Sequence, residues 1–272
     1  MQNTVVNFKE KLVLITGASS GIGRETAIAF AKKNAIIAIS GRNKNDLFSL
    51  KTLIENQGGR AKIFPFDLTN TSKVPLLINE IKNEFNSTID VLINNAGVGV
   101  FGLIENTPQK EYLQIIKVNF LAPVALTRAV IPGMKEKKFG LIINISSGAA
   151  KRGLPLLSAY CSSKAALNSF TESVRVELGP YGIKIMSFSP GLVETSFMAR
   201  TKSYGRDSNP FSEGRMLSPQ MVSEKIVQAS ERLKREVVLS NRTKITSLLN
   251  TLFPQLFDSI LARVMKKRRQ DP

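Results

Sequence analysis

Residues 12–23 read LVLITGASSGIG, an apolar run that leads directly into a glycine-rich segment. The run predicts a buried strand, and the pattern that begins at Arg24 predicts a helix. Glycines permit a tight turn and let backbone N–H groups approach a pyrophosphate at a helix N-terminus, so this order is typical of a dinucleotide-binding unit rather than an ordinary glycine turn. The residues expected to contact such a cofactor here are Gly17, Ser19, Ser20, Gly21, Ile22 and Gly23.

Short apolar runs alternate with longer segments of helical period along the rest of the chain, which predicts βαβ units around a parallel sheet. The runs are apolar almost continuously, as expected of strands covered by helices on both faces. We expect a doubly wound α/β fold of the Rossmann type. Its single sheet would have seven strands, at residues 12–15, 36–40, 62–66, 91–93, 141–145, 184–188 and 237–239.

The length and composition fit one globular domain with an appendage. The chain has 272 residues, of which 43% are hydrophobic and 22% charged, and this argues against a disordered chain. We expect one domain over residues 1–243 and a C-terminal tail over residues 244–272.

Two residue types are scarce, and their scarcity excludes several chemistries. The chain has no histidine, which rules out a Ser-His-Asp relay and histidine metal ligands, and a single cysteine, Cys161, cannot form an internal disulfide. We expect no metal site. A reducing, cytoplasmic location is the simplest expectation, because residues 1–10 lack the apolar stretch of a secretory signal and no apolar run approaches the length of a membrane span.

The formal net charge of +17 implies attraction to anions, which could be nucleic acid, anionic lipid or a phosphorylated cofactor. The basic residues are scattered along most of the chain and concentrate only at residues 266–269, so we expect no nucleic-acid partner.

The segment after the second predicted strand bears on which dinucleotide is bound. It reads Ser40-Gly41-Arg42, with no acidic residue for a ribose 2′-hydroxyl. Arg42 can offer a planar fork of donors to a 2′-phosphate, which favours NADP(H) over NAD(H), although it could also be a solvated surface arginine. Asp67, after the third strand, could accept a hydrogen bond from the adenine amino group or cap the helix expected near Thr71.

Tyr160 and Lys164 lie four residues apart in a segment, residues 159–178, with a helical pattern, so they share one helix face. A tyrosine with an ordinary pKa of about 10 is a poor base at neutral pH, and a nearby ammonium would lower that pKa by favouring the phenolate. The pair by itself could arise by chance. It gains weight because Asn94-Asn95-Ala96-Gly97, Ser146-Ser147 and Pro190-Gly191 all follow predicted strands, whose carboxyl ends face one crevice.

Together with Asn119 these residues form a set that resembles the short-chain dehydrogenase/reductase family from about Lys11 to Leu239. The resemblance implies that Tyr160 donates a proton to a carbonyl oxygen as hydride arrives, and that Lys164 binds the nicotinamide ribose and lowers the tyrosine pKa. It implies that Ser147 hydrogen-bonds the substrate oxygen and that Asn119 positions a water linking Lys164 to solvent.

The resemblance also extends the set of expected cofactor contacts beyond the glycine turn. The added residues are Leu68, Asn95, Ala96, Gly97, Tyr160, Lys164, Pro190, Gly191, Val193 and Thr195, beside Arg42 and Asp67. One position departs from the family's commonest form: Ala122 stands where glycine is frequent. This departure could shift local helix packing but removes no reacting group.

Two segments lie outside this core. Residues 196–219 are rich in Ser, Gly, Arg and Pro without clear periodicity, which indicates a mobile lid over a pocket. In the tail, apolar residues recur at helical spacing from Leu248 to Met265, interrupted at Pro254 and followed by four basic residues. This amphipathic pattern could cover the substrate pocket, pack on another subunit or lie on an anionic membrane, and the apolar stripe favours packing on protein.

The sequence thus predicts an NADP(H)-dependent oxidoreductase that interconverts a carbonyl and a secondary alcohol on a small-molecule substrate, with a bias toward a bulky apolar lipid, steroid or acyl compound. We also expect a homodimer or homotetramer. The alternatives are a 3-oxoacyl thioester reductase and a non-catalytic nucleotide-sensing or nucleic-acid-binding protein that keeps the fold.

Overall fold

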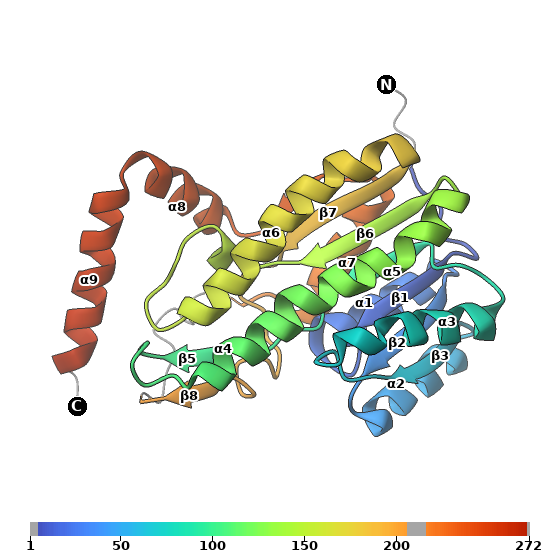
Figure 1. The fold of residues 1–272 in the computed structure, drawn as a ribbon, viewed down its shortest axis with the longest axis horizontal. Coiled ribbons are helices and arrows are strands. Elements are labelled where there is room, and N and C mark those ends of the chain that lie inside the picture. The colour runs from blue at the N-terminus through green and yellow to red at the C-terminus, as the bar shows by residue number, and fades with distance from the viewer. Residues whose placement is uncertain (1–4, 206–215, 271–272) are drawn as a thin grey trace.

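The protein contains one seven-stranded parallel sheet with helices on both faces (Figure 1). The computed structural model describes residues 5–205 and 216–270. The sheet has the order β3-β2-β1-β4-β6-β7-β9, and every adjacent pair is parallel. Its strands are β1 (Leu12–Thr16), β2 (Ile36–Gly41), β3 (Arg60–Pro65), β4 (Val91–Asn94), β6 (Gly140–Ile145), β7 (Ile183–Ser189) and β9 (Glu236–Val238). The predicted doubly wound fold and its seven strands are confirmed.

Alternate side chains of the strands are buried in two separate hydrophobic cores, one on each face of the sheet, because helices cover both faces. Val13 and Ile15 of β1 pack against α1 (Gly21–Ala31), α2 (Lys44–Asn56) and α7 (Pro219–Glu231). Leu12 and Leu14 face the opposite side, where α3 (Val74–Phe85), α5 (Ala122–Glu136) and α6 (Ser158–Leu178) lie.

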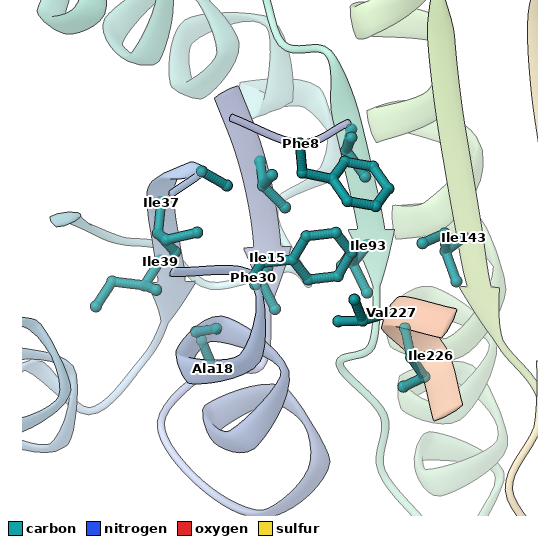
Figure 2. Packing of buried hydrophobic residues seen from close by; sticks show 14 of the residues in the cluster. Phe8, Ile15, Ala18, Phe30, Ile37, Ile39, Ile93, Ile143, Ile226 and Val227 are labelled. Atoms are coloured by element: carbon teal, nitrogen blue, oxygen red, sulfur yellow. The ribbon is translucent and has the colours of Figure 1, made fainter. Parts of the chain in front are cut away.

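The N-terminal segment closes the edge of the first core. Figure 2 shows Phe8 against Phe30 of α1, with Ile15, Ile93 and Val227 around them. The two phenyl rings are 4.9 Å apart and 71° from parallel, the edge-to-face arrangement that aromatic quadrupoles favour.

A second, two-stranded sheet lies beside the main one. It pairs β5 (Val100–Gly102) with β8 (Lys202–Tyr204) in parallel. The sequence predicted a lid over residues 196–219, and β8 lies inside that range. Residues 206–215 lie outside the described part of the chain, so the predicted mobility stays a prediction.

A continuous helical run covers residues Gln109–Glu136 and includes α4 (Gln109–Ile116), a π-helical turn η2 (Lys117–Leu121) and α5. By length and composition alone this run could cross a membrane. In this fold Leu126, Val130 and Met134 of α5 are buried in the second core, so α5 has the packing of a core helix. Ala122, the departure from the family pattern, is also fully buried there.

Two helices follow the last strand, α8 (Asn241–Leu252) and α9 (Pro254–Gln270). Both extend away from the sheet, and α9 forms one end of the molecule in Figure 1. The helical conformation is interrupted between them at Phe253, because the ring of Pro254 cannot continue the preceding helix.

Candidate active site

The sheet order reverses between β1 and β4, because β2 and β3 extend to one side of β1 and the remaining strands to the other. In such sheets ligands bind outside the carboxyl ends of the strands at this switch point. A cavity of about 1650 Å³ lies there and is lined by residues that follow β1, β2, β3, β4, β6 and β7.

Almost every residue predicted for the site lines this cavity. The lining includes Gly17, Ser19, Ser20, Gly21, Ile22, Arg42, Asp67, Leu68, Asn95, Ala96, Gly97, Ser147, Tyr160, Lys164, Pro190, Gly191, Val193 and Thr195. Gly23 and Asn119 do not line it. They lie just behind the wall, where both are buried.

The glycine turn is fixed by the end of β4. The Asn95 side-chain amide donates to the backbone oxygens of Thr16, at 2.9 Å, and Gly17, at 3.2 Å. The Thr16 hydroxyl accepts from the backbone N–H groups of Asn95 and Ala96, at 3.1 and 3.2 Å. Thr16 directly precedes the glycine turn in the sequence. No sequence pattern indicates that its hydroxyl connects the end of β1 to the end of β4.

The positions of two glycines show why no larger residue fits this turn. Gly17 has a φ of +64°, and a Cβ there would lie 2.8 Å from the Cα of Ala96. A Cβ on Gly23 would lie 2.4 Å from both the Asn95 amide nitrogen and the Gly17 oxygen. Gly23 therefore lets helix and turn pack closely, which explains its place behind the cavity wall.

The glycine turn fits a dinucleotide pyrophosphate. Helix α1 begins at Gly21, and the Ser20 side chain makes no capping hydrogen bond to its first turn. Backbone N–H groups at the start of a helix favour an anion. Ser20 accepts a hydrogen bond of 2.9 Å from the Arg200 guanidinium. A cation that no sequence motif predicted therefore lies beside the turn.

Arg42 and Asp67 line the far end of the cavity. Arg42 is exposed and makes no hydrogen bond or ion pair with any residue in the described part of the chain, so its guanidinium is free to bind an anionic group. One oxygen of Asp67 accepts from the backbone and hydroxyl groups of Thr69, at 2.9 and 3.0 Å. Asp67 thus caps the turn at Thr69, just before the expected helix start, while its other oxygen makes no bond with the described residues.

Tyr160 and Lys164 lie on α6, as predicted, and Ser147 lies at the N-cap of the short helix η3 (Gly148–Ala150). The Ser147 hydroxyl oxygen accepts from the backbone of Ala149 at 3.1 Å, and the Ser147 side chain is close enough to Tyr160 to lower the pKa of its phenol. The fold therefore places a phenol and a hydroxyl near each other on the wall of the cavity.

Lys164 is held by the sheet. Its ammonium donates a 2.8 Å hydrogen bond to the backbone oxygen of Ile145, at the end of β6, and only 4% of the residue is exposed. Burial lowers the Lys164 pKa to about 8. The group is still mostly protonated at neutral pH, as a ribose-binding ammonium requires.

The expected effect of Lys164 on Tyr160 is not what the structure shows. Burial raises the pKa of Tyr160 to about 12, and the nearby Ser147 side chain, which lowers it, offsets only part of that rise. The Lys164 ammonium lies 6.0 Å from the centre of the Tyr160 ring and is directed to the Ile145 oxygen. Desolvation of the phenolate therefore outweighs the field of the ammonium, a balance that a spacing of four residues cannot reveal.

Asn119 lies in the π-helical turn η2 and links three segments. Its amide exchanges two hydrogen bonds of 2.9 Å with the backbone of Val98 and donates to the Ser163 hydroxyl at 3.1 Å. A Cβ on Gly97 would lie 3.5 Å from the Asn119 oxygen and 3.8 Å from the Lys164 nitrogen. Asn119 and Lys164 thus approach the same side of Gly97, the arrangement that the predicted water bridge needs.

A cluster around the buried Glu111, which the sequence did not reveal, fixes the segment after β7. Glu111 of α4 accepts from the Lys202 ammonium at 2.8 and 3.0 Å and from the Tyr204 hydroxyl at 2.9 Å. The hydrogen bond from Lys202 lowers the pKa of Glu111. Phe197 of the same segment packs on Tyr160, with ring centres 5.8 Å apart. The segment therefore covers the reacting end of the cavity.

Comparison with known proteins agrees with this geometry. Residues 11–205 match the family model described as short chain dehydrogenase. The chain is 36% identical to the ketoacyl reductase HetN of Nostoc sp., over 89% of this chain and 82% of that one. It is 32% identical to the dehydrogenase/reductase SDR family member 7B of Xenopus tropicalis, over 96% and 88% of the two chains.

A solved structure shows the same likeness in three dimensions. The crystal structure of a metagenomic short-chain oxidoreductase in complex with NADP superposes with a TM-score of 0.73 at 27% identity, covering 86% of this chain and 98% of the other. The family model alone matches well over half of the chain, and its range contains the turn, Ser147, Tyr160 and Lys164. The chain therefore belongs to the short-chain dehydrogenase/reductase family.

Proposed function

We propose that this oxidoreductase uses NADP(H) to interconvert a ketone and a secondary alcohol on a bulky apolar substrate. The observation that carries the proposal is that Ser147, Tyr160 and Lys164 line one cavity that continues to the glycine turn. A proton donor and an anion-binding turn on one cavity are what a hydride-transfer reaction with a dinucleotide needs.

The residues present fit the dinucleotide. The start of α1 would hold its pyrophosphate, Lys164 its nicotinamide ribose, and Arg42 the 2′-phosphate that distinguishes NADP(H). The free guanidinium of Arg42 and the absence of an acidic residue in Ser40-Gly41-Arg42 support NADP(H) over NAD(H). When bound, the nicotinamide supplies or accepts the hydride.

The chain's own groups supply the proton. With a pKa of about 12, Tyr160 is protonated at neutral pH and can donate its proton to a carbonyl oxygen, which favours reduction there. Ser147 holds the reacting oxygen by a second hydrogen bond, and the charge on Lys164 stabilises the phenolate left on Tyr160. In the opposite direction the Tyr160 phenolate accepts the alcohol proton.

The proposed apolar substrate follows from the wall of the cavity beyond Tyr160. Leu154, Leu157 and Phe197 lie there, and Phe257 and Leu261 of α9 close the same space. A pocket of this lining stabilises an acyl chain or ring system through burial of apolar surface.

One observation favours a narrower second function, reduction of a 3-oxoacyl thioester. The Nostoc relative bears the name ketoacyl reductase. Arg242 also lines this cavity and makes no ion pair with the described residues, so a cation is available for the anionic carrier of such a thioester.

Turnover by the full-length protein tests the proposal. NADPH oxidation is followed with methyl ketones of increasing chain length and with 3-oxoacyl thioesters of matched length. We expect kcat/KM to increase with the chain of the free ketone. A thioester preference at every length would select the second function, and no turnover with either series would contradict both.

A further inference from the structure

The two C-terminal helices, α8 and α9, which we call the arm, carry most of their large apolar side chains in solvent. Ile245, Leu248, Leu252, Phe253 and Leu256 are each between 55% and 62% exposed. Elsewhere in the described residues the exposed large apolar side chains are scattered, and no other helix carries more than one. Such a contiguous apolar face marks a site of interaction.

The spacing puts three of these side chains on one side of α8. Ile245, Leu248 and Leu252 recur there at intervals of three and four, and residues at these intervals lie above one another on a helix. Leu256 is exposed in the first turn of α9, just after the break between the two helices. We call these four residues the outer face of the arm.

A different stripe of α9 packs on the protein. Phe257, Ile260, Leu261 and Val264 line the active-site cavity, and Met265 packs against the buried cluster that includes Leu157 and Cys161. An ion pair between Asp258 and Arg152 adds a polar link. The arm is therefore held by its inner stripe, and the outer face contributes nothing to closing the cavity.

The charges around the outer face are almost all positive. Residues 241–270 contain seven basic residues and one acidic residue, Asp258. Lys244, Arg263 and Lys266 are exposed and lie outside the cavity lining, and none of them is paired with an acidic side chain in the described part of the chain. Asp258 is already occupied by Arg152.

We propose that the outer face of the arm docks on an anionic membrane surface, with its leucines at the boundary between headgroups and acyl chains and its cations against lipid phosphates. An amphipathic helix with a basic polar side is the form that binds such surfaces. α9 then lies between the lipid and the cavity that its inner stripe lines. A lipid-soluble carbonyl compound would have a short path to Tyr160.

The positive charges of the arm favour lipid over a second copy of this chain as the occupant of the outer face. In a symmetric dimer built on the outer face, the cations of one arm would face the cations of the other, because a two-fold interface pairs the same surface with itself. Like charges at short distance are unfavourable. An anionic bilayer is complementary to the same charges.

Co-sedimentation of the full-length protein with vesicles tests this proposal without using activity. The probes are phosphatidylcholine vesicles and vesicles that contain equal parts of phosphatidylcholine and phosphatidylglycerol. We expect binding to the second kind that weakens as salt is raised, since mobile ions screen the contact with phosphates. Equal binding to both kinds, or to neither, would overturn the proposal.

Substitutions assign the binding to the outer face. Leu252→Glu/Leu256→Glu should weaken binding at least about tenfold, because two leucines no longer enter the lipid. The matched control is Leu76→Glu/Val176→Glu, which alters two exposed apolar residues outside the arm and should bind as the wild type does. Equal binding by the arm variant and the wild type would contradict the proposal.

Two further readouts distinguish docking on lipid from misfolding of the variant and from self-association. Neither Leu252 nor Leu256 lines the cavity, so the arm variant should keep its thermal unfolding midpoint and its NADPH-dependent turnover of a water-soluble ketone. Should that variant misfold, Arg263→Glu/Lys266→Glu tests the same face and should lose the preference for anionic vesicles. A wild-type dimer without lipid that either variant converts to a monomer would show that the outer face binds a second copy and refute the lipid proposal.

Discussion

The Lys164 ammonium lies 6.0 Å from the centre of the Tyr160 ring and donates its 2.8 Å hydrogen bond to the backbone of Ile145. The lysine is therefore positioned by the sheet, and the tyrosine by its own helix and by Phe197, which packs on its ring. Without a bound cofactor, burial dominates both groups: it raises the pKa of Tyr160 to about 12 and lowers that of Lys164 to about 8. A protonated phenol beside an ammonium group of lowered pKa is an arrangement suited to proton donation at neutral pH.

The buried ammonium should destabilise the protein at neutral pH. Lys164 has a folded-state pKa of about 8 against an ordinary value of 10.5, so between these values the unfolded chain binds more protons and stability rises with pH. Relative to Lys164→Met, the free energy of unfolding of the wild type should increase by roughly 2 kcal/mol from pH 7.5 to 9.5. Urea denaturation at the two pH values measures this difference. A constant or shrinking difference would show that the ammonium is not desolvated.

Arg42 should determine the preference for NADPH. Arg42→Ala removes a charged donor from the 2′-phosphate, so NADPH affinity should fall by about 10- to 100-fold while NADH affinity stays unchanged. Fluorescence titration of both cofactors measures this. Lys44→Ala, an equal loss of charge at an exposed residue outside the cavity lining, is the control and should leave NADPH affinity nearly unchanged. Equal affinities of the wild type for the two cofactors would rule out the assignment.

Gly23 should tolerate no side chain. In Gly23→Ala the new Cβ would lie 2.4 Å from the Asn95 amide and from the Gly17 oxygen, so turn and helix must separate. We expect a loss of about 1–3 kcal/mol in stability, typical of overpacking, together with weaker cofactor binding. The comparison is Gly153→Ala, whose Cβ meets nothing within 4 Å. Thermal unfolding of both variants measures the effect, and equal midpoints would contradict the close approach.

Glu111 should hold the segment that covers Tyr160. Glu111→Gln removes the charge that binds Lys202 and Tyr204, so the segment should loosen and KM should rise about tenfold or more as the substrate is less well positioned. Limited proteolysis should cut the variant faster between residues 192 and 205. Glu105→Gln, at an exposed residue without an ion pair among the described residues, should match the wild type in both assays.

The sequence predicted the sheet well because its strands are buried on both faces and read as unbroken apolar runs. The exceptions are the two edge strands. β3 was expected at residues 62–66 and lies at Arg60–Pro65, and β9 was expected at residues 237–239 and lies at Glu236–Val238. Each pairs with a single neighbour and has exposed residues, so the apolar runs placed these strands one or two residues too late. The strands β5 and β8 were missed because each has three residues and pairs across about a hundred residues of chain.

The candidate site was also predicted only in part. Residues that belong to motifs, such as Ser147 and Tyr160, were found because their spacing is fixed by the fold. Glu111 and Lys202 were not found, since 91 residues separate them and no local pattern joins them. The sequence predicted only the effect of Lys164 on the Tyr160 pKa, whereas burial raises that pKa to about 12 and follows from packing in three dimensions.

The most direct test of this mechanism is Tyr160→Phe. The variant keeps the ring that packs on Phe197 and removes only the hydroxyl that we propose as the proton donor. NADPH binding, measured by fluorescence, and NADPH oxidation with the best ketone substrate should be compared with the wild type. We expect unchanged binding and a loss of turnover of at least about 100-fold, the usual contribution of general acid catalysis. Turnover equal to that of the wild type would contradict the role of Tyr160 and with it the proposed mechanism.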